Sequence, residues 1–183
     1  MKKLLTLLII LAMSCTPTNE KKVMDFTTTF EKSGGTQTAT YDETIQYYSD
    51  LAETYPEISI QAIGTTDSGK PLHILTLNPD KEFDFETIRQ TKRILLINNG
   101  IHPGEPDGID ATMMLYRDIV QGKIEVPKNT VLVTIPIYNV GGSLNRNSTT
   151  RTNQNGPEAY GFRGNARNYD LNRDFIKCDT KNA

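Results

Sequence analysis

The sequence predicts an α/β protein, a sandwich in which helices cover a central sheet. Two continuous apolar runs, residues 93–98 and 130–138, have the pattern of buried strands. Residues 108–121, between them, have the character of a helix, and residues 42–55 carry apolar side chains at helical spacing. Because strands and helices alternate along the chain, we expect a single α/β domain.

The first fifteen residues have the pattern of an export signal. Two lysines precede an apolar run at residues 4–13, which is too short to span a bilayer. Ser14 and Cys15 follow, and a Cys directly after a small residue resembles a bacterial lipoprotein cleavage site. We expect residues 1–14 to be a signal peptide and Cys15 to carry lipid, so that an exported protein is attached to the membrane through that anchor only. Ordinary signal cleavage beside an incidental Cys is the alternative.

Composition and charge fit one globular domain. The chain is 37% apolar and 23% charged, which are ordinary values. Removing the first fourteen residues takes Lys and Arg from 20 to 18 against 22 Asp and Glu, so the net charge changes from -2 to -4. This balance argues against nucleic acid as a partner. If Cys15 carries lipid, Cys178 is the remaining thiol and no internal disulfide is expected.

The first half of the chain is predicted to hold a helix and a hairpin. Residues 15–40 begin with the Cys, are mostly polar, and predict a tether followed by an extended segment that leads into the domain. The helix at residues 42–55 ends at Pro56. Residues 58–64 alternate as a strand does, and residues 71–77 predict a second strand. The turn residues between these two strands predict a hairpin.

The second half is predicted to place polar residues in loops after its strands. Asn139 follows the strand at residues 130–138. Residues 141–166 then form a long irregular loop, and a loop of that length is usually functional or disordered. Asp179 and Thr180 have the pattern of a helix start.

The most informative stretch is residues 94–107, with the sequence I-L-L-I-N-N-G-I-H-P-G-E-P-D. The apolar run breaks at N-N-G and places His102 and Glu105 in a turn before a helix, where open α/β sheets keep their active sites. Imidazole and carboxylate are ligands that suit zinc. A turn His and a helix-start Glu that interacts with the helix dipole are the alternative. Asp107 is one candidate acceptor for the second N–H of a zinc-bound His102.

A second stretch, residues 168–175, has the sequence N-Y-D-L-N-R-D-F. Together with the H-P-G-E turn, it resembles the zinc metallocarboxypeptidase family of the carboxypeptidase A and B type. The resemblance implies an α/β/α sandwich with a mixed central sheet that is incomplete at the C-terminus. It makes residues 41–183 the N-terminal part of the catalytic domain, and it implies Zn²⁺ held by His102 and Glu105.

The resemblance also assigns substrate-binding residues. It implies that Asn172 and Arg173 hold the terminal carboxylate of the substrate, which a guanidinium matches with two hydrogen bonds. A surface ion pair of Arg173 with Asp170 or Asp174 is the alternative. The family has a further Arg upstream, which stabilises charge on the substrate carbonyl oxygen, and Arg151 best matches it. The other candidates are Arg146, Arg163 and Arg167.

The family takes its third zinc ligand, a His, and its general-base Glu from regions after the Asn-Arg pair. His73 and His102 are the two histidines of this chain, and neither follows that pair. His73 lies in a strand pattern without a nearby acid, which favours a packing role. We therefore expect the chain to be the N-terminal part of a longer enzyme or a truncated product without full activity.

The sequence thus predicts a metallocarboxypeptidase-type zinc hydrolase that cleaves peptide bonds next to a free C-terminal carboxylate, with a peptide or protein C-terminus as its substrate. By itself the chain is expected to be inactive, because it lacks the third ligand and the base. Two alternatives stay open: a related zinc deacylase or amidase acting on small amino-acid conjugates, and a non-catalytic lipoprotein fragment.

Overall fold

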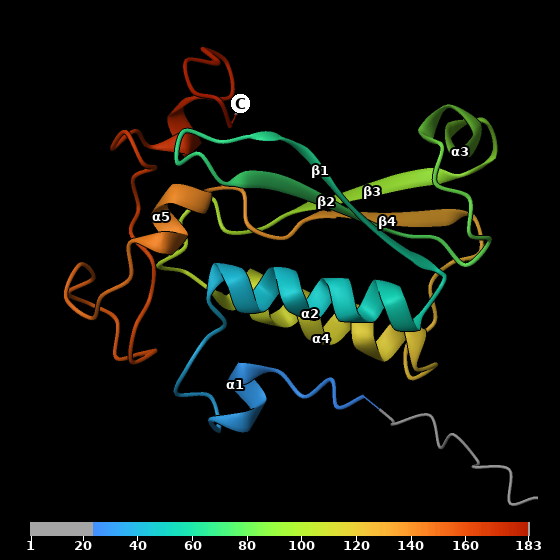
Figure 1. Ribbon diagram of the computed structural model, residues 1–183, viewed down its shortest axis with the longest axis horizontal. Helices are drawn as coiled ribbons and strands as arrows, with labels where there is room; N and C mark the ends of the chain where they lie inside the picture. The colour runs from blue at the N-terminus through green and yellow to red at the C-terminus, as the bar shows by residue number, and fades with distance from the viewer. Residues whose placement is uncertain (1–23, 183) are drawn as a thin grey trace, which may run out of the picture.

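The computed structural model describes residues 24–182. Its centre is a four-stranded sheet with the strand order β1-β2-β4-β3. The strands are β1 (Ile58–Thr65), β2 (Pro71–Leu77), β3 (Arg93–Asn98) and β4 (Thr130–Ile135). β1 and β2 form an antiparallel hairpin, β2 pairs antiparallel with β4, and β3 pairs parallel with β4. This mixed sheet with its helices confirms the predicted α/β class (Figure 1).

Two long helices lie side by side along one face of the sheet (Figure 1). They are α2 (Tyr41–Thr54) and α4 (Asp107–Val120), each within one residue of its predicted bounds. The side chains enclosed between these helices and the sheet are almost completely buried, and each aliphatic one contributes about 1.5–3 kcal/mol by leaving water. They include Tyr48, Leu51, Leu75, Met113 and Tyr116. The main core of the protein therefore lies on this face.

The opposite face carries a smaller cluster under a short helix, α3 (Phe85–Thr91), which the sequence patterns did not reveal. Ile88 of this helix packs against Val131 and Val133 of β4. Asp84 caps the helix by accepting a hydrogen bond from the Thr87 N–H at 3.0 Å. α3 spans seven residues, which is too few for an apolar periodicity to show in the sequence.

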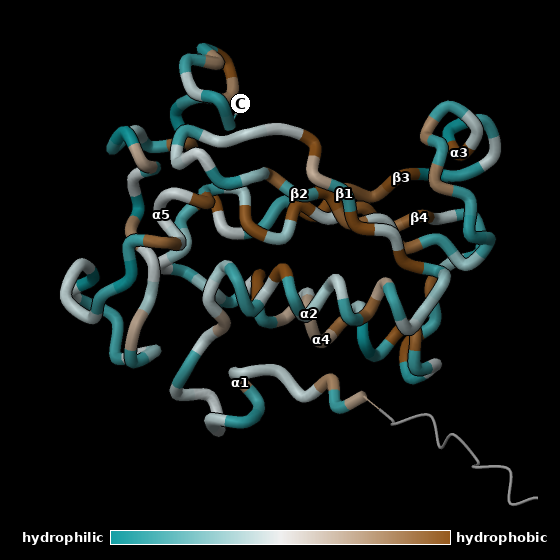
Figure 2. The backbone as a smooth tube through the Cα atoms, in the orientation of Figure 1, coloured by the Kyte–Doolittle hydropathy of each residue, from teal (hydrophilic) through white to brown (hydrophobic). Residues whose placement is uncertain are grey.

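β3 has the predicted bounds, but the prediction that it is buried is wrong for the described part of the chain. Ile94, Leu95 and Leu96 are 41%, 53% and 54% exposed. The reason is the strand order, since β3 lies at the edge of the sheet and pairs with β4 alone. Figure 2 shows the hydrophobic residues along this edge strand.

The segment before α2 packs on α4 instead of extending as predicted. It contains a short helix, α1 (Thr29–Lys32), that begins with a capping box formed by Thr28 and Glu31. Arg117 of α4 donates hydrogen bonds to the Phe26 carbonyl oxygen at 3.2 Å and to the Glu31 carboxylate at 2.6 Å. These contacts hold residues 26–31 against the helix that follows the H-P-G-E turn.

The predicted signal peptide at residues 1–14 and the predicted lipid-bearing Cys15 lie outside the described residues. Within residues 24–182, no helix has the length and apolar character needed to cross a membrane.

The loops after β3 and β4 meet at one edge of the sheet, because the two strands are parallel. The loop after β4 begins with a short helix, α5 (Val140–Leu144), where irregular chain was expected. Its N-cap is Asn139, whose side chain accepts a hydrogen bond from the Gly142 N–H at 2.8 Å. The rest of the chain folds beside this edge and includes a 3₁₀ turn, η1 (Leu171–Arg173) (Figure 1).

The helix start predicted at Asp179 stays a prediction, because the structure describes only residues 180–182 after it. Residues 174–182 form turns and irregular structure. The N–H groups of Asp179 and Thr180 donate to the Asp174 carboxylate at 2.8 Å and 3.1 Å. A side-chain acceptor several residues upstream therefore closes a turn at this point.

Candidate metal and substrate site

The turn after β3 is held by backbone hydrogen bonds to the loop after β4. The Tyr138 N–H donates to the Asn99 carbonyl oxygen at 2.8 Å, and the Asn139 N–H donates to the Gly100 carbonyl oxygen at 3.1 Å. Gly100 has a φ of 64°, a left-handed conformation that a glycine adopts without steric cost. The parallel pairing thus continues past the strand ends and places His102 at the carboxyl edge of the sheet, as predicted.

The imidazole of His102 is 6% exposed and has a carboxylate partner on one side. Its Nε2 lies 2.9 Å from Oδ1 of Asp170. Its Nδ1 lies 3.9 Å from Oε1 of Glu105. Because a carboxylate accepts hydrogen bonds, Asp170 favours the proton on Nε2, which leaves a lone pair on Nδ1. The proposal that Asp107 is the acceptor is therefore wrong, since Asp170 takes that place.

Asp170 joins three groups through its two carboxylate oxygens. Besides His102, Oδ1 accepts the Asn172 N–H at 3.0 Å. Oδ2 accepts Nε and Nη2 of Arg163 at 3.1 Å and 2.9 Å. Burial alone would raise the pKa of Asp170, but the hydrogen bonds from His102 and Arg163, with the Asn172 N–H, outweigh it and lower the pKa to about 2. Asp170 is thus ionised at neutral pH and can orient the imidazole.

Arg151 pairs with the same carboxylate oxygen of Glu105 that lies 3.9 Å from the imidazole. Its Nη2 is 2.6 Å from Oε1 of Glu105. The Arg151 N–H donates to the Tyr160 hydroxyl at 3.2 Å, which fixes the backbone of this part of the loop. Gln154 follows in the same loop and donates from Nε2 to the Gly104 carbonyl oxygen at 2.9 Å. The structure therefore brings Arg151 into contact with Glu105, beside His102.

The four candidate arginines separate into two at the site and two away from it. Arg163 joins Arg151 at the site, since its Nη1 lies 3.4 Å from Nδ1 of His102. Arg167 stacks on Tyr169, with its guanidinium carbon 4.7 Å from the ring centroid. Arg146 points away from His102. It donates to the carbonyl oxygens of Thr38 and Ala39, which precede α2, and of Ala159 in the loop after α5.

Asn172 and Arg173 are exposed on η1. They lie next to Asp170, the hydrogen-bond partner of His102, rather than in contact with His102 itself. Asp170 caps this turn through the Asn172 N–H, and the Arg173 Nη1 donates to the Asn172 carbonyl oxygen at 2.9 Å. Within residues 24–182, Arg173 forms no ion pair, so the ion pair with Asp170 or Asp174 is not the explanation of this residue. Arg173 and Tyr169 line a hollow of about 260 Å³.

Two functional candidates differ from the residues that the sequence favours. Asp170 is not among the predicted site residues, and Arg163 is one of the other candidate arginines beside the favoured Arg151. From the sequence, Asp170 is indicated only as a possible ion-pair partner of Arg173. The available signal was its place two residues before Asn172 in the N-Y-D-L-N-R stretch. A carboxylate so near the candidate carboxylate-binding pair can also reach a candidate metal ligand such as His102.

The chemistry of the two donor atoms fits a divalent cation. Zinc bonds to imidazole nitrogen at about 2.0–2.1 Å and to carboxylate oxygen at about 2.0–2.2 Å. Donors 3.9 Å apart can therefore reach one ion between them with little movement. The guanidinium groups of Arg163 and Arg151 lie next to these donors, so cationic groups already contact both of them. Among residues 24–182, no three His, Cys, Asp or Glu side chains converge as a metal-binding group.

Comparison with known proteins identifies the family. A zinc carboxypeptidase family model matches residues 44–182, which is most of the chain. The chain belongs to the zinc carboxypeptidase family. The match confirms the resemblance inferred from the two motifs and covers both of them. No curated protein matches the chain.

Solved carboxypeptidases share the fold. A metallo-carboxypeptidase from Burkholderia cenocepacia has a TM-score of 0.54 at 20% identity, over 76% of this chain and 33% of that one. A metallo-carboxypeptidase from Pseudomonas aeruginosa has a TM-score of 0.53 at 17% identity, over 76% and 32%. Carboxypeptidase A from Helicoverpa armigera has a TM-score of 0.51 at 19% identity, over 58% and 25%. The chain thus spans a quarter to a third of the length of these structures.

Close packing around Gly104 predicts that a methyl group there will disturb the site. A Cβ at this position would lie 2.7 Å from Nε of Arg151 and 2.8 Å from the Gly161 carbonyl oxygen. We expect Gly104→Ala to lower the free energy of unfolding by about 1–3 kcal/mol, because overpacking forces a backbone shift. Gly64→Ala is the matched control, since nothing lies within 4 Å of its Cβ. Urea unfolding of both variants is the measurement, and equal stabilities would contradict this packing.

Proposed function

We propose that the complete protein is a zinc carboxypeptidase that hydrolyses the peptide bond next to a free C-terminal carboxylate. The family match supports a metallocarboxypeptidase-type hydrolase. The single observation that carries the residue assignment is the orientation of His102. Its Nε2 is held by Asp170, while its Nδ1 lies 3.9 Å from the Glu105 carboxylate. At this separation the two groups can bind one ion.

His102 and Glu105 hold Zn²⁺ in this proposal. When bound, zinc polarises the scissile carbonyl and lowers the pKa of a water molecule toward neutrality. Asp170 keeps the imidazole in the tautomer that exposes Nδ1, and Arg163 keeps Asp170 ionised. We place the third protein ligand and the general base outside residues 1–183, as the family resemblance implies.

Arg151 stabilises charge on the carbonyl oxygen of the substrate. Its side chain is 24% exposed and its guanidinium lies beside the Glu105 carboxylate, so it can reach a group that approaches the metal. A fixed cation near a developing oxyanion stabilises the transition state more than the ground state. A hollow of about 320 Å³ in front of Arg151 and Arg163 offers space for that part of the substrate.

Asn172 and Arg173 bind the terminal carboxylate. The Arg173 guanidinium is exposed and has no ion-pair partner within residues 24–182, so it is available for an anion. The similar Pseudomonas aeruginosa enzyme was solved with (2-guanidinoethylmercapto)succinic acid, a compound that carries carboxylates. A guanidinium with an adjacent amide can hold such a group with directed hydrogen bonds.

Two other functions make different predictions. A zinc deacylase or amidase of similar fold would use the same metal ligands but would not need the Arg173 guanidinium for every substrate. A non-catalytic lipoprotein would bind peptides without turnover. The family match and the paired His102 and Glu105 favour an enzyme, and substrate tests separate the two enzyme classes.

The metal assignment predicts that Asp170 controls zinc affinity without contacting zinc. In the complete protein, including any residues that follow Ala183, we expect about one zinc per chain. Asp170→Asn should weaken zinc binding by about 10- to 100-fold, because the imidazole loses its orienting acceptor. The double variant His102→Ala, Glu105→Ala should lose the metal. Zinc content after dialysis, with competition by a chelator, measures both effects. A double variant that retains full zinc content would refute the ligand assignment.

The carboxylate assignment predicts a loss confined to substrates with a free C-terminus. Arg173→Gln should lower kcat/KM about 10- to 100-fold, since a hydrogen bond to a charged group contributes about 1.5–3 kcal/mol. Arg167→Gln removes the same charge nearby and should have little effect, because its guanidinium stacks on Tyr169. Peptides with free and amidated C-termini are compared. Equal hydrolysis of both would favour the deacylase or amidase.

We also propose that the protein is exported and anchored to the membrane through lipid on Cys15. The basic start, the short apolar run and the Ser14-Cys15 junction support this proposal. Metabolic labelling with a fatty-acid analogue should mark the wild-type protein and leave Cys15→Ala unlabelled. Equal labelling of the two proteins, or none in either, would rule out the anchor.

A further inference from the structure

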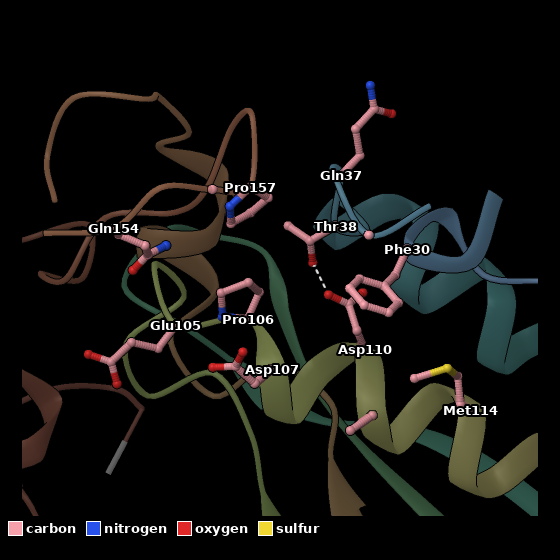
Figure 3. Close-up of a pocket in the computed structure, with 13 residues that line it drawn as sticks. Phe30, Gln37, Thr38, Glu105, Pro106, Asp107, Asp110, Met114, Gln154 and Pro157 are labelled. Atoms are coloured by element: carbon pink, nitrogen blue, oxygen red, sulfur yellow. Dashed lines mark hydrogen bonds between the residues drawn. The ribbon is translucent and has the colours of Figure 1, made fainter. Parts of the chain in front are cut away.

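A cavity of about 480 Å³ lies between α1, the first turns of α4 and the loop after α5 (Figure 3). Phe30 of α1 forms one wall and Met114 of α4 lies below it. Pro157 and Gln154 approach from the loop. The cavity is therefore built by three segments that are far apart in the sequence, and its size suits an amino-acid side chain.

The lining carries negative charge and no positive charge. Glu105, Asp107 and Asp110 contribute carboxyl groups, and no Lys, Arg or His is among the lining residues. Asp110 is buried and engaged, since it accepts hydrogen bonds from the Thr38 hydroxyl and, at 3.4 Å, from the Ala39 N–H. Asp107 is exposed and forms no hydrogen bond or ion pair through its carboxylate within residues 24–182. Asp107 is thus the carboxylate available to a ligand.

The partial positive charge at the N-terminus of α4 repels a bound cation, but less strongly than the Asp107 carboxylate attracts it. A helix N-terminus is equivalent to roughly +0.5 elementary charge, and the Asp107 carboxylate carries a full negative charge in its first turn. The apolar walls formed by Phe30 and Met114 suit a hydrocarbon stem. A long side chain that ends in a cation satisfies both parts of the cavity, because such side chains bury the stem and keep the charged end near polar groups.

The cavity adjoins the candidate active site through Glu105 and Gln154. Glu105 belongs to the cavity lining, yet its carboxylate points away from the cavity toward Arg151 (Figure 3). Contacts run from η1 through Asp170 to His102 and on to Glu105. η1 and the cavity lie at the two ends of this series of contacts. If Arg173 on η1 holds the terminal carboxylate of a substrate, the residues upstream of its scissile bond therefore extend past the metal ligands toward the cavity.

We propose that this cavity is a specificity subsite for a Lys or Arg side chain upstream of the scissile bond, with Asp107 as its specificity-determining residue. The assignment deepens the proposed carboxypeptidase function and rests on it. Asp107 binds the ammonium or guanidinium group, while Phe30 and Met114 contact the stem. The substrate class is therefore a peptide with a basic residue shortly before its C-terminus.

Binding to the cavity can be tested separately from catalysis. Saturation-transfer difference NMR on the complete protein compares Nα-acetyl-lysine amide with Nα-acetyl-norleucine amide, which lacks the charge. The lysine compound should give the stronger signal, and Asp107→Asn should reduce it to the norleucine level. Glu125→Gln is the control, because it removes the same charge from an exposed residue outside the cavity. Equal signals from the two compounds, or no change in Asp107→Asn, would overturn the subsite.

Kinetics test the same site as part of the enzyme. Peptides with Lys or norleucine at each of the four positions upstream of the scissile bond are compared. At the position that occupies the cavity, Asp107→Asn should lower kcat/KM for the Lys peptide about 3- to 10-fold and leave the norleucine peptide unchanged. Ala111→Lys places a cation in the lining on an exposed helix position and should give the same selective loss. A uniform loss on both peptides would argue against a specificity role.

The two readouts distinguish failure of the subsite from failure of the proposed function. Lysine-selective binding that depends on Asp107, without hydrolysis of any peptide, would support the cation site and refute the carboxypeptidase. Hydrolysis without any preference for Lys upstream, in wild type or variants, would leave the carboxypeptidase in place and refute the subsite.

Discussion

The hydrogen bond between His102 and Asp170 joins two parts of the chain that are 68 residues apart, and both sides of the site depend on it. The same Oδ1 atom accepts the N–H of Asn172 and so begins the turn that carries Arg173. One carboxylate oxygen therefore orients the candidate zinc ligand and positions the candidate carboxylate-binding pair. Arg163 neutralises the other oxygen, which keeps a partly exposed acid ionised without repelling the substrate.

The long loop after β4 is precise because it packs on the H-P-G-E turn through small residues. A Cβ at Gly161 would lie 2.6 Å from the Pro103 Cβ, and one at Gly142 would lie 2.4 Å from the Phe162 carbonyl oxygen. The backbones thus approach more closely than any side chain would allow. With the bond from Gln154 to the turn, this packing holds Arg151 against Glu105 although neither lies in a strand or a long helix.

The two ends of the candidate site differ in the cations that they offer. Arg173 and Lys177 lie at the η1 end beside Asp170, Asp174 and Asp179, whereas Asp107 and Asp110 line the cavity at the α4 end, whose lining contains no Lys, Arg or His. A peptide whose C-terminal carboxylate meets the first end and whose upstream basic residue meets the second would be oriented by both. Electrostatic complementarity of this kind selects among substrates and guides their approach more than it adds affinity.

The sequence by itself determined the α/β class, the bounds of β2, β3, α2 and α4 to within one residue, and the family with its paired His102 and Glu105. Those features are local, since periodicity, turn residues and short motifs each depend on a few neighbouring positions. The tertiary structure decided the rest. The exposure of β3 follows from the strand order, and α3 and α5 are too short to show a period. The choice of Asp170 over Asp107 as the partner of His102 depends on which distant segment reaches the imidazole, and only the packed chain fixes that distance.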